Sequence, residues 1–242
     1  MNDFFDNDSD EEEPPSITSQ STDKTDSMNL ELNNDSPRGK LRLCVSITNA
    51  RSLAPKINSL IDNFSELDLH FSKITESWLR EGQPLRDAVH DLNAGCNLDM
   101  LTHNRPTKNG RRTAGGGITF VYNRNRMSMR ELKVRKGKSE MLVAVGKILN
   151  VSRKLMVIGI YLSPKMKAEK RKEAMGCLRD AIATAKNDFR DPYIVIAGDT
   201  NKMSISGGIE NYPDVSMNLL GPQGDWLNLT FWRPTSAPSH LR

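Results

Sequence analysis

Short apolar runs, each ended by polar or turn-forming residues, recur between residues 41 and 198. Runs of this length that are rich in Val, Ile, Leu and aromatic residues are typical of β-strands. They predict strands at 41–48, 67–75, 117–123, 127–134, 140–149, 154–162 and 192–198. The four strands between 117 and 162 have short connections, so we expect them to form an antiparallel meander. Residues 80–96 look irregular.

Two stretches instead repeat apolar side chains every three or four residues, which indicates amphipathic helices. Residues 50–64 place Leu53, Ile57, Leu60, Ile61 and Phe64 on one helical face. Residues 167–189 do the same with Ala174, Cys177, Leu178, Ala181, Ile182 and Ala185. Strands dominate and two helices are available to cover sheet faces. This combination predicts an α+β layered domain with a largely two-sheet core.

The first 40 residues differ from the rest of the chain. They are acidic, rich in Ser, Thr and Asn, and poor in apolar residues. Such a segment cannot bury enough surface to offset its ordering entropy, which predicts disorder. We therefore expect an acidic disordered tail at 1–40 and one globular domain at 41–242.

Charge is distributed unevenly along the chain. Residues 1–39 hold eleven acidic and two basic residues, a net charge of −9, whereas the whole chain carries +4. The remainder therefore carries +13. A basic body favours a polyanionic partner. An ordinary solvated surface is the alternative interpretation.

Cysteine usage and hydropathy bear on location. The three cysteines, Cys44, Cys96 and Cys177, are far apart and match neither a zinc pattern nor a disulfide framework. No apolar run approaches the roughly 18–20 residues of a membrane span. The acidic N-terminus is unlike the basic start of a signal peptide. These features predict an intracellular protein, which we expect in the nucleus, with no membrane partner.

Polar side chains follow several of the apolar runs. The predicted strands end on Asn49, on Glu76, near Tyr161, and on Asp199 with Asn201. If these ends share one edge of the sheets, carboxylates, amides and a phenol converge there. Carboxylate oxygens suit Mg²⁺, which usually takes one or two of them while a substrate phosphate supplies further oxygens. Each residue also has a simpler interpretation. Asn49 could cap the following helix, Asp199 and Asn201 could form a turn, and Tyr161 could be a core residue.

The segments that carry these residues resemble a known family. They occur in the order expected of the endonuclease/exonuclease/phosphatase superfamily, and most closely resemble the endonuclease domain of non-LTR retrotransposons, itself similar to apurinic/apyrimidinic endonucleases. The resemblance covers about residues 41–201 and rests on TNARSLAPKINSL (48–60), ELDLHFSKITESWL (66–79), GGGITFVYN (115–123), IGIYLSP (158–164) and IVIAGDTN (194–201). It implies a four-layer α/β sandwich of two packed, mainly antiparallel sheets flanked by helices.

The resemblance also implies an activity and residue roles. The activity is Mg²⁺-dependent (or Mn²⁺-dependent) hydrolysis of DNA phosphodiesters that leaves a 3′-hydroxyl. Glu76 matches the metal-binding glutamate and Asn49 the asparagine of the first motif. Tyr161 matches the phosphate-contacting tyrosine. Asp199 matches the aspartate that orients or activates water, and Asn201 matches its partner asparagine.

The family pattern continues past Asn201 with a strand that carries an aspartate and a terminal Ser-Asp-His. The chain ends at Arg242, and its Ser239-His240 lacks the intervening aspartate. The resemblance therefore implies a domain truncated at its C-terminal end, without its last strands. Loss of a positioned acid–base group typically costs ~10²–10⁴ in rate, so we expect impaired activity. The alternatives are an inactive remnant that binds nucleic acid or protein, and a small-molecule phosphatase or phosphodiesterase.

Two loop features complete the expectations. A basic loop before the triple glycine can contact DNA phosphates through Arg105, Lys108, Arg111 and Arg112, although a solvated loop explains it equally well. The glycines 115–117 lack the Gly-Lys-Ser/Thr ending of a phosphate-binding loop, and we interpret them as a flexible entry to the next strand.

Overall fold

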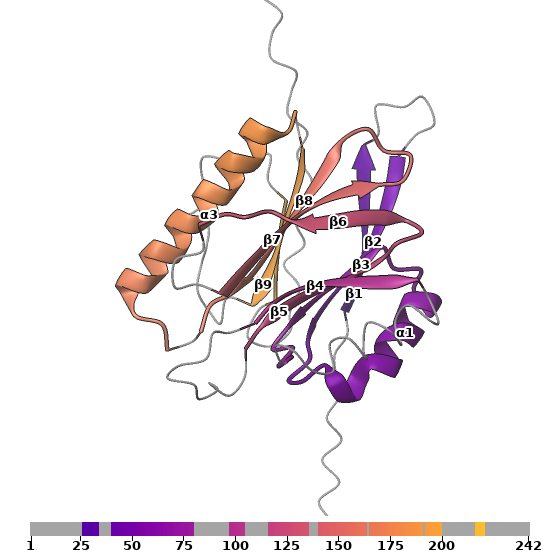
Figure 1. Cartoon of the computed structure of the whole chain (residues 1–242), viewed down its shortest axis with the longest axis horizontal. Helices are drawn as coiled ribbons and strands as arrows, with labels where there is room; N and C mark the ends of the chain where they lie inside the picture. Colours follow the sequence, from indigo (N-terminus) through magenta and orange to yellow (C-terminus); the bar gives the residue numbers. More distant parts are fainter. Residues whose placement is uncertain are drawn as a thin grey trace, which may run out of the picture.

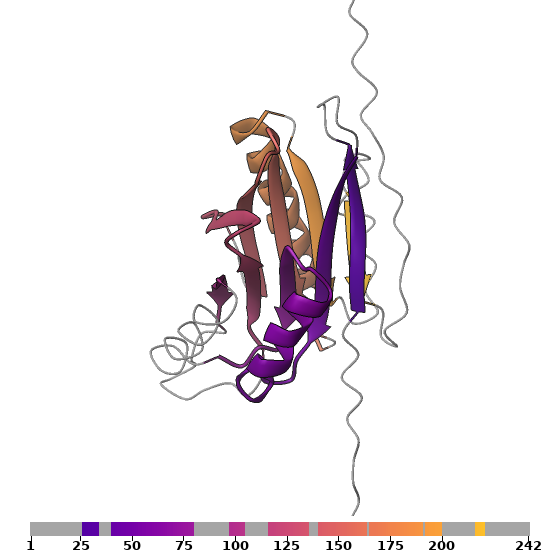
Figure 2. The ribbon, with the colours of Figure 1, turned by 90° about the vertical axis from the view of Figure 1, so that its right-hand side faces the viewer.

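The computed structural model describes residues 26–33, 40–79, 97–104, 116–135, 140–163, 165–190, 192–199 and 216–220. For residues 26–33, 40–42, 199 and 216–220 it describes the backbone alone. Two five-stranded sheets form the centre of this part of the chain, and one helix lies on the outer side of each sheet (Figures 1 and 2).

The first sheet has the order β1-β2-β3-β5-β4. Its strands are β1 (Asp26–Asn33), β2 (Lys40–Asn49), β3 (Phe71–Thr75), β5 (Ile118–Asn123) and β4 (Leu98–His103). β2 and β3 are parallel, and the other neighbouring pairs are antiparallel. A short 3₁₀ helix (Ala54–Lys56) and α1 (Ile57–Glu66) connect β2 to β3.

The second sheet has the order β10-β9-β8-β7-β6. Its strands are β10 (Ser216–Leu220), β9 (Tyr193–Asp199), β8 (Lys154–Tyr161), β7 (Glu140–Ile148) and β6 (Met127–Glu131). The pairs β6–β7 and β7–β8 are antiparallel, whereas β8–β9 and β9–β10 are parallel. The helix α3 (Ala168–Asp188) connects β8 to β9.

Three apolar clusters separate the four layers. The cluster between the sheets contains Leu43 and Val45 of β2, Leu155 and Val157 of β8, and Val195 of β9. The intervening positions of the second sheet, such as Met156 and Ile158, pack against Leu178 and Ile182 of α3. On the other side, Leu60 and Phe64 of α1 pack against the outer face of the first sheet. Alternation along the central strands therefore buries both sheet faces, which confirms the expected α+β sandwich.

The predicted meander is correct in only three of its four strands. β6, β7 and β8 pair in sequence, but β5 pairs with β3 and β4 in the other sheet. The turn at 124–126 therefore passes from one sheet to the other. A short turn between two strands usually joins neighbours in one sheet, so the hydrophobic pattern could not reveal this crossing.

Other boundaries differ from the sequence prediction. β1 lies inside the segment 1–40 that composition predicts to be disordered, and it pairs with β2 from Asp26↔Ile47 to Asn33↔Lys40. β4 was not predicted, because polar residues interrupt its sequence LDMLTH. The predicted helix at 167–189 is confirmed by α3. Among the described residues, no helix is long and apolar enough to cross a membrane.

Candidate active site

The polar strand ends named above lie at one edge of the sandwich. Asn49 ends β2 and is in register with Thr75, the residue before Glu76 on the parallel neighbour β3. Tyr161 ends β8 and is in register with Asp199, the last residue of the parallel neighbour β9. Each sheet therefore contributes an adjacent pair of these positions.

A contact between two side chains joins the two pairs. The Tyr161 hydroxyl, from the second sheet, donates a long hydrogen bond of 3.5 Å to Oε1 of Glu76, from the first sheet. Both residues are half-buried. The ring of Tyr161 packs against the inter-sheet cluster, so its apolar body serves the core while its hydroxyl reaches the edge. The phenol and the carboxylate are thus close enough to share one small ligand.

The backbone at Glu76 has an unusual conformation. Glu76 has a φ of 52° and Trp78 a φ of 50°, in the left-handed region that residues other than glycine rarely adopt. Such a residue costs roughly 1–3 kcal/mol and persists only where its surroundings hold it. Backbone bonds on one side do so, since the amides of Ser52 and Leu53 donate to the carbonyls of Glu76 and Ser77 at 2.9 Å each.

Two buried glycines hold the other side of the segment 76–78, which we call the Glu76 turn. The amide of Ser77 donates to the Gly117 carbonyl (3.4 Å), and the amide of Trp78 donates to the Gly116 carbonyl (3.1 Å). Gly117 has a φ of 88°, and a Cβ at this position would lie 2.8 Å from the Ser77 hydroxyl oxygen. Gly116 and Gly117 therefore lead into β5, as expected, in a left-handed backbone conformation that favours glycine (φ of 87° and 88°).

Glu140 belongs to this edge and was missed in the sequence. It begins β7, is in register with Tyr161, and its Oε2 accepts a 2.9 Å hydrogen bond from the Gly117 amide. The alternation of β7 contained a usable signal, because Glu140 shares its parity with Leu142 and Ala144, which face the inter-sheet cluster. Glu140 is thus an acid on the inward face at the end of a strand.

The simpler interpretation of one predicted residue does not hold. Neither the 3₁₀ helix nor α1 has a side-chain N-cap, so Asn49 is not a helix cap. Its Oδ1 instead accepts from the Arg51 amide at 3.3 Å. Asp199 is the last residue of β9, in register with Tyr161 on one side and Leu220 on the other. The residues that would form a turn with Asp199 lie outside the described part of the chain.

Five predicted residues cannot be placed at this edge. Asn201 and the four basic loop residues Arg105, Lys108, Arg111 and Arg112 lie outside the described residues. The roles that the resemblance implies for them remain predictions, as does the arrangement of the last part of the chain.

The donors at this edge fit a hard divalent cation. Mg²⁺ takes oxygen ligands and keeps several waters, so one or two protein carboxylates are enough to hold it. Glu76 supplies one carboxylate, and the backbone of Asp199 follows the strand beside Tyr161 to the same edge. Within the described ranges, no three or more His, Cys, Asp and Glu side chains are grouped so that they could hold a metal ion by themselves.

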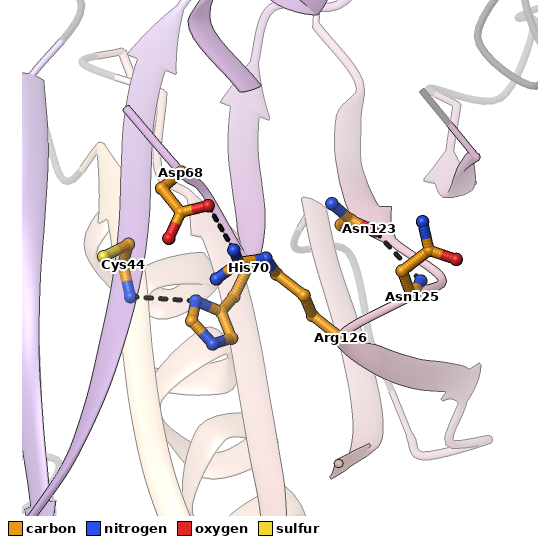
Figure 3. Close-up of polar contacts among 6 residues, drawn as sticks. All are labelled: Cys44, Asp68, His70, Asn123, Asn125 and Arg126. Carbon is orange, nitrogen blue, oxygen red and sulfur yellow. Dashed lines mark hydrogen bonds and ion pairs between the residues drawn. The ribbon is translucent and has the colours of Figure 1, made fainter. Parts of the chain in front are cut away.

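A second polar cluster lies at the other end of β3 (Figure 3). His70, 7% exposed, accepts a 3.2 Å hydrogen bond from the Cys44 amide at Nδ1. The His70 amide donates back to the Cys44 carbonyl at 2.8 Å, and Asp68 forms an ion pair with Arg126. Burial lowers the pKa of His70, the Arg126 guanidinium lowers it further, and Asp68 opposes them.

Tyr122 of β5 lies at that same end, in register with Phe71. Its hydroxyl donates to Asp99 Oδ2 at 3.0 Å. Burial raises the pKa of Tyr122 to about 12, and the hydrogen bond to Asp99 contributes in the same direction. This end of the sandwich thus has its own tyrosine–carboxylate pair, formed within one sheet.

Comparison with known proteins identifies the fold. No family model and no curated protein matches the chain. The structure is similar to an endonuclease/exonuclease/phosphatase family protein from Bacteroides thetaiotaomicron, with a TM-score of 0.50 and 10% identity over 81% of this chain and 72% of that one. That similarity shows that the described part of the chain has the fold of this superfamily.

Two further solved structures give lower scores. Humanized D. rerio TDP2 has a TM-score of 0.46 and 14% identity, over 72% of this chain and 71% of that chain. The 3′-5′ exonuclease NExo from Neisseria meningitidis has a TM-score of 0.47 and 13% identity, over 65% of this chain. The match spans 57% of the NExo chain.

Proposed function

We propose that this protein is a metal-dependent phosphodiesterase that nicks DNA, of the type encoded by non-LTR retrotransposons. The observation that carries the proposal is the contact between Tyr161 of one sheet and Glu76 of the other, at the edge where β9 ends on Asp199. A phenol and a carboxylate from separate sheets meet there beside a strained backbone. Backbone conformations of this kind cluster at active sites and ligand clamps.

Each residue has a chemical task in this proposal. Glu76 would hold Mg²⁺ or Mn²⁺, which would supply positive charge near the phosphate oxygens. The Tyr161 hydroxyl exchanges its long bond to Glu76 for a bond to a non-bridging phosphate oxygen. Asp199 orients the attacking water and accepts its proton, and the amide of Asn201 holds Asp199 in place. As the water oxygen bonds to phosphorus, the P–O3′ bond breaks, and the departing 3′ oxygen takes a proton from solvent to become the 3′-hydroxyl. The amide of Asn49 would donate to a phosphate oxygen or orient the attacking water.

DNA is the proposed substrate because of the charge of the body. Residues 40–242 carry a net charge of +13, and affinity for a duplex comes largely from Lys and Arg neutralising phosphates. In this proposal Arg105, Lys108, Arg111 and Arg112 contact the DNA backbone and set its position, without reading bases. A small phosphate ester would not require so basic a surface.

The test uses the full chain with supercoiled plasmid, in Mg²⁺, in Mn²⁺ and in EDTA. We expect metal-dependent nicking that falls by roughly 10²–10³-fold in Glu76→Gln and Asp199→Asn, the scale of losing one positioned electrostatic group. Glu66→Gln, an exposed acid at the end of α1, is the matched control and should keep full activity. The nicks should carry 3′-hydroxyls that a DNA polymerase extends.

Three results would contradict the proposal. Nicking that persists equally in Glu76→Gln would show that it comes from a contaminant. DNA binding in a gel shift without nicking would instead establish a binding protein. Hydrolysis of a small phosphate ester without cleavage of plasmid would establish a small-molecule phosphatase or phosphodiesterase.

A further inference from the structure

Glu140 connects the two sheets at the candidate site. It begins β7 of the second sheet, and its Oε2 accepts from the amide of Gly117, which precedes β5 of the first sheet, at 2.9 Å. This distance is typical of a well-formed N–H···O hydrogen bond. The bond therefore fixes the spacing of the two sheets at one point of the edge.

The segment that Glu140 holds is the one that supports Glu76. The carbonyls of Gly117 and Gly116 accept the amides of Ser77 and Trp78, the two residues that follow Glu76. A continuous set of contacts thus leads from the Glu140 carboxylate through the Gly117 backbone to the Glu76 turn. The left-handed φ of Glu76 requires such external support.

Glu140 is equally close to the second partner of the site. β7 and β8 are antiparallel, and Glu140 is directly opposite Tyr161 in their register. The backbone of Glu140 is therefore fixed beside Tyr161, while its side chain is fixed to the segment beside Glu76. Both halves of the 3.5 Å contact between Tyr161 and Glu76 depend on the same residue.

We infer that Glu140 is a positioning residue that sets the distance and orientation between Glu76 and Tyr161 through its hydrogen bond to Gly117. The inference rests on the proposed function, since it assigns Glu140 to support the metal-binding carboxylate. Groups that orient a metal ligand are typically worth about 10–100-fold in metal affinity or activity.

Two variants of the full chain distinguish the effect of the length of the Glu140 side chain from the effect of its charge. Glu140→Gln keeps the length of the side chain and an oxygen acceptor but removes the charge. Glu140→Asp keeps the charge but shortens the side chain, so its carboxylate cannot meet the Gly117 amide in the same place. Glu66→Asp, an exposed acid at the end of α1, is the matched control.

The first measurement is amide hydrogen exchange of the peptides that cover residues 76–78 and 116–118, without metal. We expect exchange about tenfold faster in Glu140→Asp, no more than about twofold faster in Glu140→Gln, and no change in the control. The second is Mn²⁺ affinity by titration calorimetry. Its Kd should rise about 10–100-fold in Glu140→Asp and by less than about threefold in Glu140→Gln.

Each contrary outcome has a distinct meaning. Unchanged exchange and Kd in Glu140→Asp would overturn the inference. A Kd that rises in Glu140→Gln but not in Glu140→Asp would also overturn it, because charge would then matter and reach would not. If the unaltered chain neither binds Mn²⁺ nor nicks DNA, the proposed function fails, and the exchange measurement alone decides whether Glu140 holds the Glu76 turn.

Discussion

The two ends of β3 (Phe71–Thr75) carry polar clusters of different character. His70 precedes the strand and Glu76 follows it. At the His70 end, side chains and backbone satisfy one another: Cys44 and His70 exchange two hydrogen bonds, and Asp68 pairs with Arg126. At the Glu76 end, the tyrosine–carboxylate bond is long, at 3.5 Å, and joins two sheets. A left-handed backbone occurs at both ends, at Glu76 and at Asp68.

The tyrosine–carboxylate bonds distinguish the structural polar cluster at the His70 end from the candidate site at the Glu76 end. Both ends hold a half-buried acid that is bonded to a tyrosine, so residue type does not separate them. The tyrosine bonds do. Tyr122 reaches Asp99 at 3.0 Å within one sheet, whereas Tyr161 reaches Glu76 at 3.5 Å across two sheets. The Tyr122 hydroxyl also reaches the carbonyl of Met129 at 3.4 Å, so two protein acceptors hold it.

The largest predicted difference between the two ends concerns their tyrosine hydroxyls. Under the proposed function, Tyr161→Phe removes a donor to the substrate phosphate and should lower nicking roughly 10²-fold. Tyr122→Phe removes a hydroxyl of the other end and should leave nicking unchanged while lowering the free energy of unfolding by about 1 kcal/mol. Plasmid nicking and urea unfolding measure the two quantities. A loss of nicking in Tyr122→Phe equal to that in Tyr161→Phe would remove the distinction between the ends.

A smaller effect concerns the glycine that supports the Glu76 turn. Gly117→Ala introduces a Cβ 2.8 Å from the Ser77 hydroxyl oxygen, on a backbone with a φ of 88°. We expect a loss of roughly 1–3 kcal/mol in unfolding free energy, measured by urea denaturation. Gly176→Ala in α3 is the control, because no atom lies within 4 Å of its added Cβ. Alanine is the better helix former, so this variant should gain about 0.5–1 kcal/mol. Equal stability of the two variants would contradict the strain assigned to Gly117.

The smallest predicted effect is a pH dependence of stability at the His70 end. The pKa of His70 in the folded protein is lowered from its ordinary value of 6.5, so below that value the unfolded chain binds more protons than the folded one. Stability from this group is complete above pH 6.5 and is lost as pH falls toward and below the folded pKa. Thermal unfolding between pH 7.5 and 5 should show this loss.

The variant His70→Asn isolates that contribution. Its side-chain oxygen can accept from the Cys44 amide in place of Nδ1, but it does not titrate. Its unfolding temperature should therefore fall less than that of the unaltered chain between pH 7.5 and 5. Parallel curves for the two proteins would show that His70 does not titrate differently on folding. Nicking at pH 7.5 should be the same in both.

Much of the Glu76 end was predictable from the sequence, because strand ends are visible in the hydrophobic pattern. The apolar runs before Asn49, Glu76 and Asp199 place these residues at the ends of strands, and the resemblance supplies their roles. The structure adds that Tyr161 and Asp199 are neighbours in register. That pairing depends on a parallel arrangement, which no local pattern encodes.

The remainder depends on contacts between distant segments. Glu140 meets Gly117 across 23 positions of sequence, and neither residue belongs to a pattern that names its partner. The edge strand β4 alternates too weakly to be recognised. The passage from β5 to β6 looks like a hairpin, because a turn of given length is used both within a sheet and between sheets. Local propensity cannot separate these cases.

The passage of the chain between sheets after Asn123 has a kinetic consequence. β6, β7 and β8 pair with their immediate neighbours in sequence, so their contacts close short loops. β5 instead pairs with β3, and even their closest partners in sequence, Thr75 and Ile118, are farther apart along the chain. Since short loops close faster than long ones, we expect β6, β7 and β8 to pair with one another before β5 pairs with β3. Glu76 and Tyr161 then meet only in the last step, so the ability to act on substrate should be the final property that refolding restores.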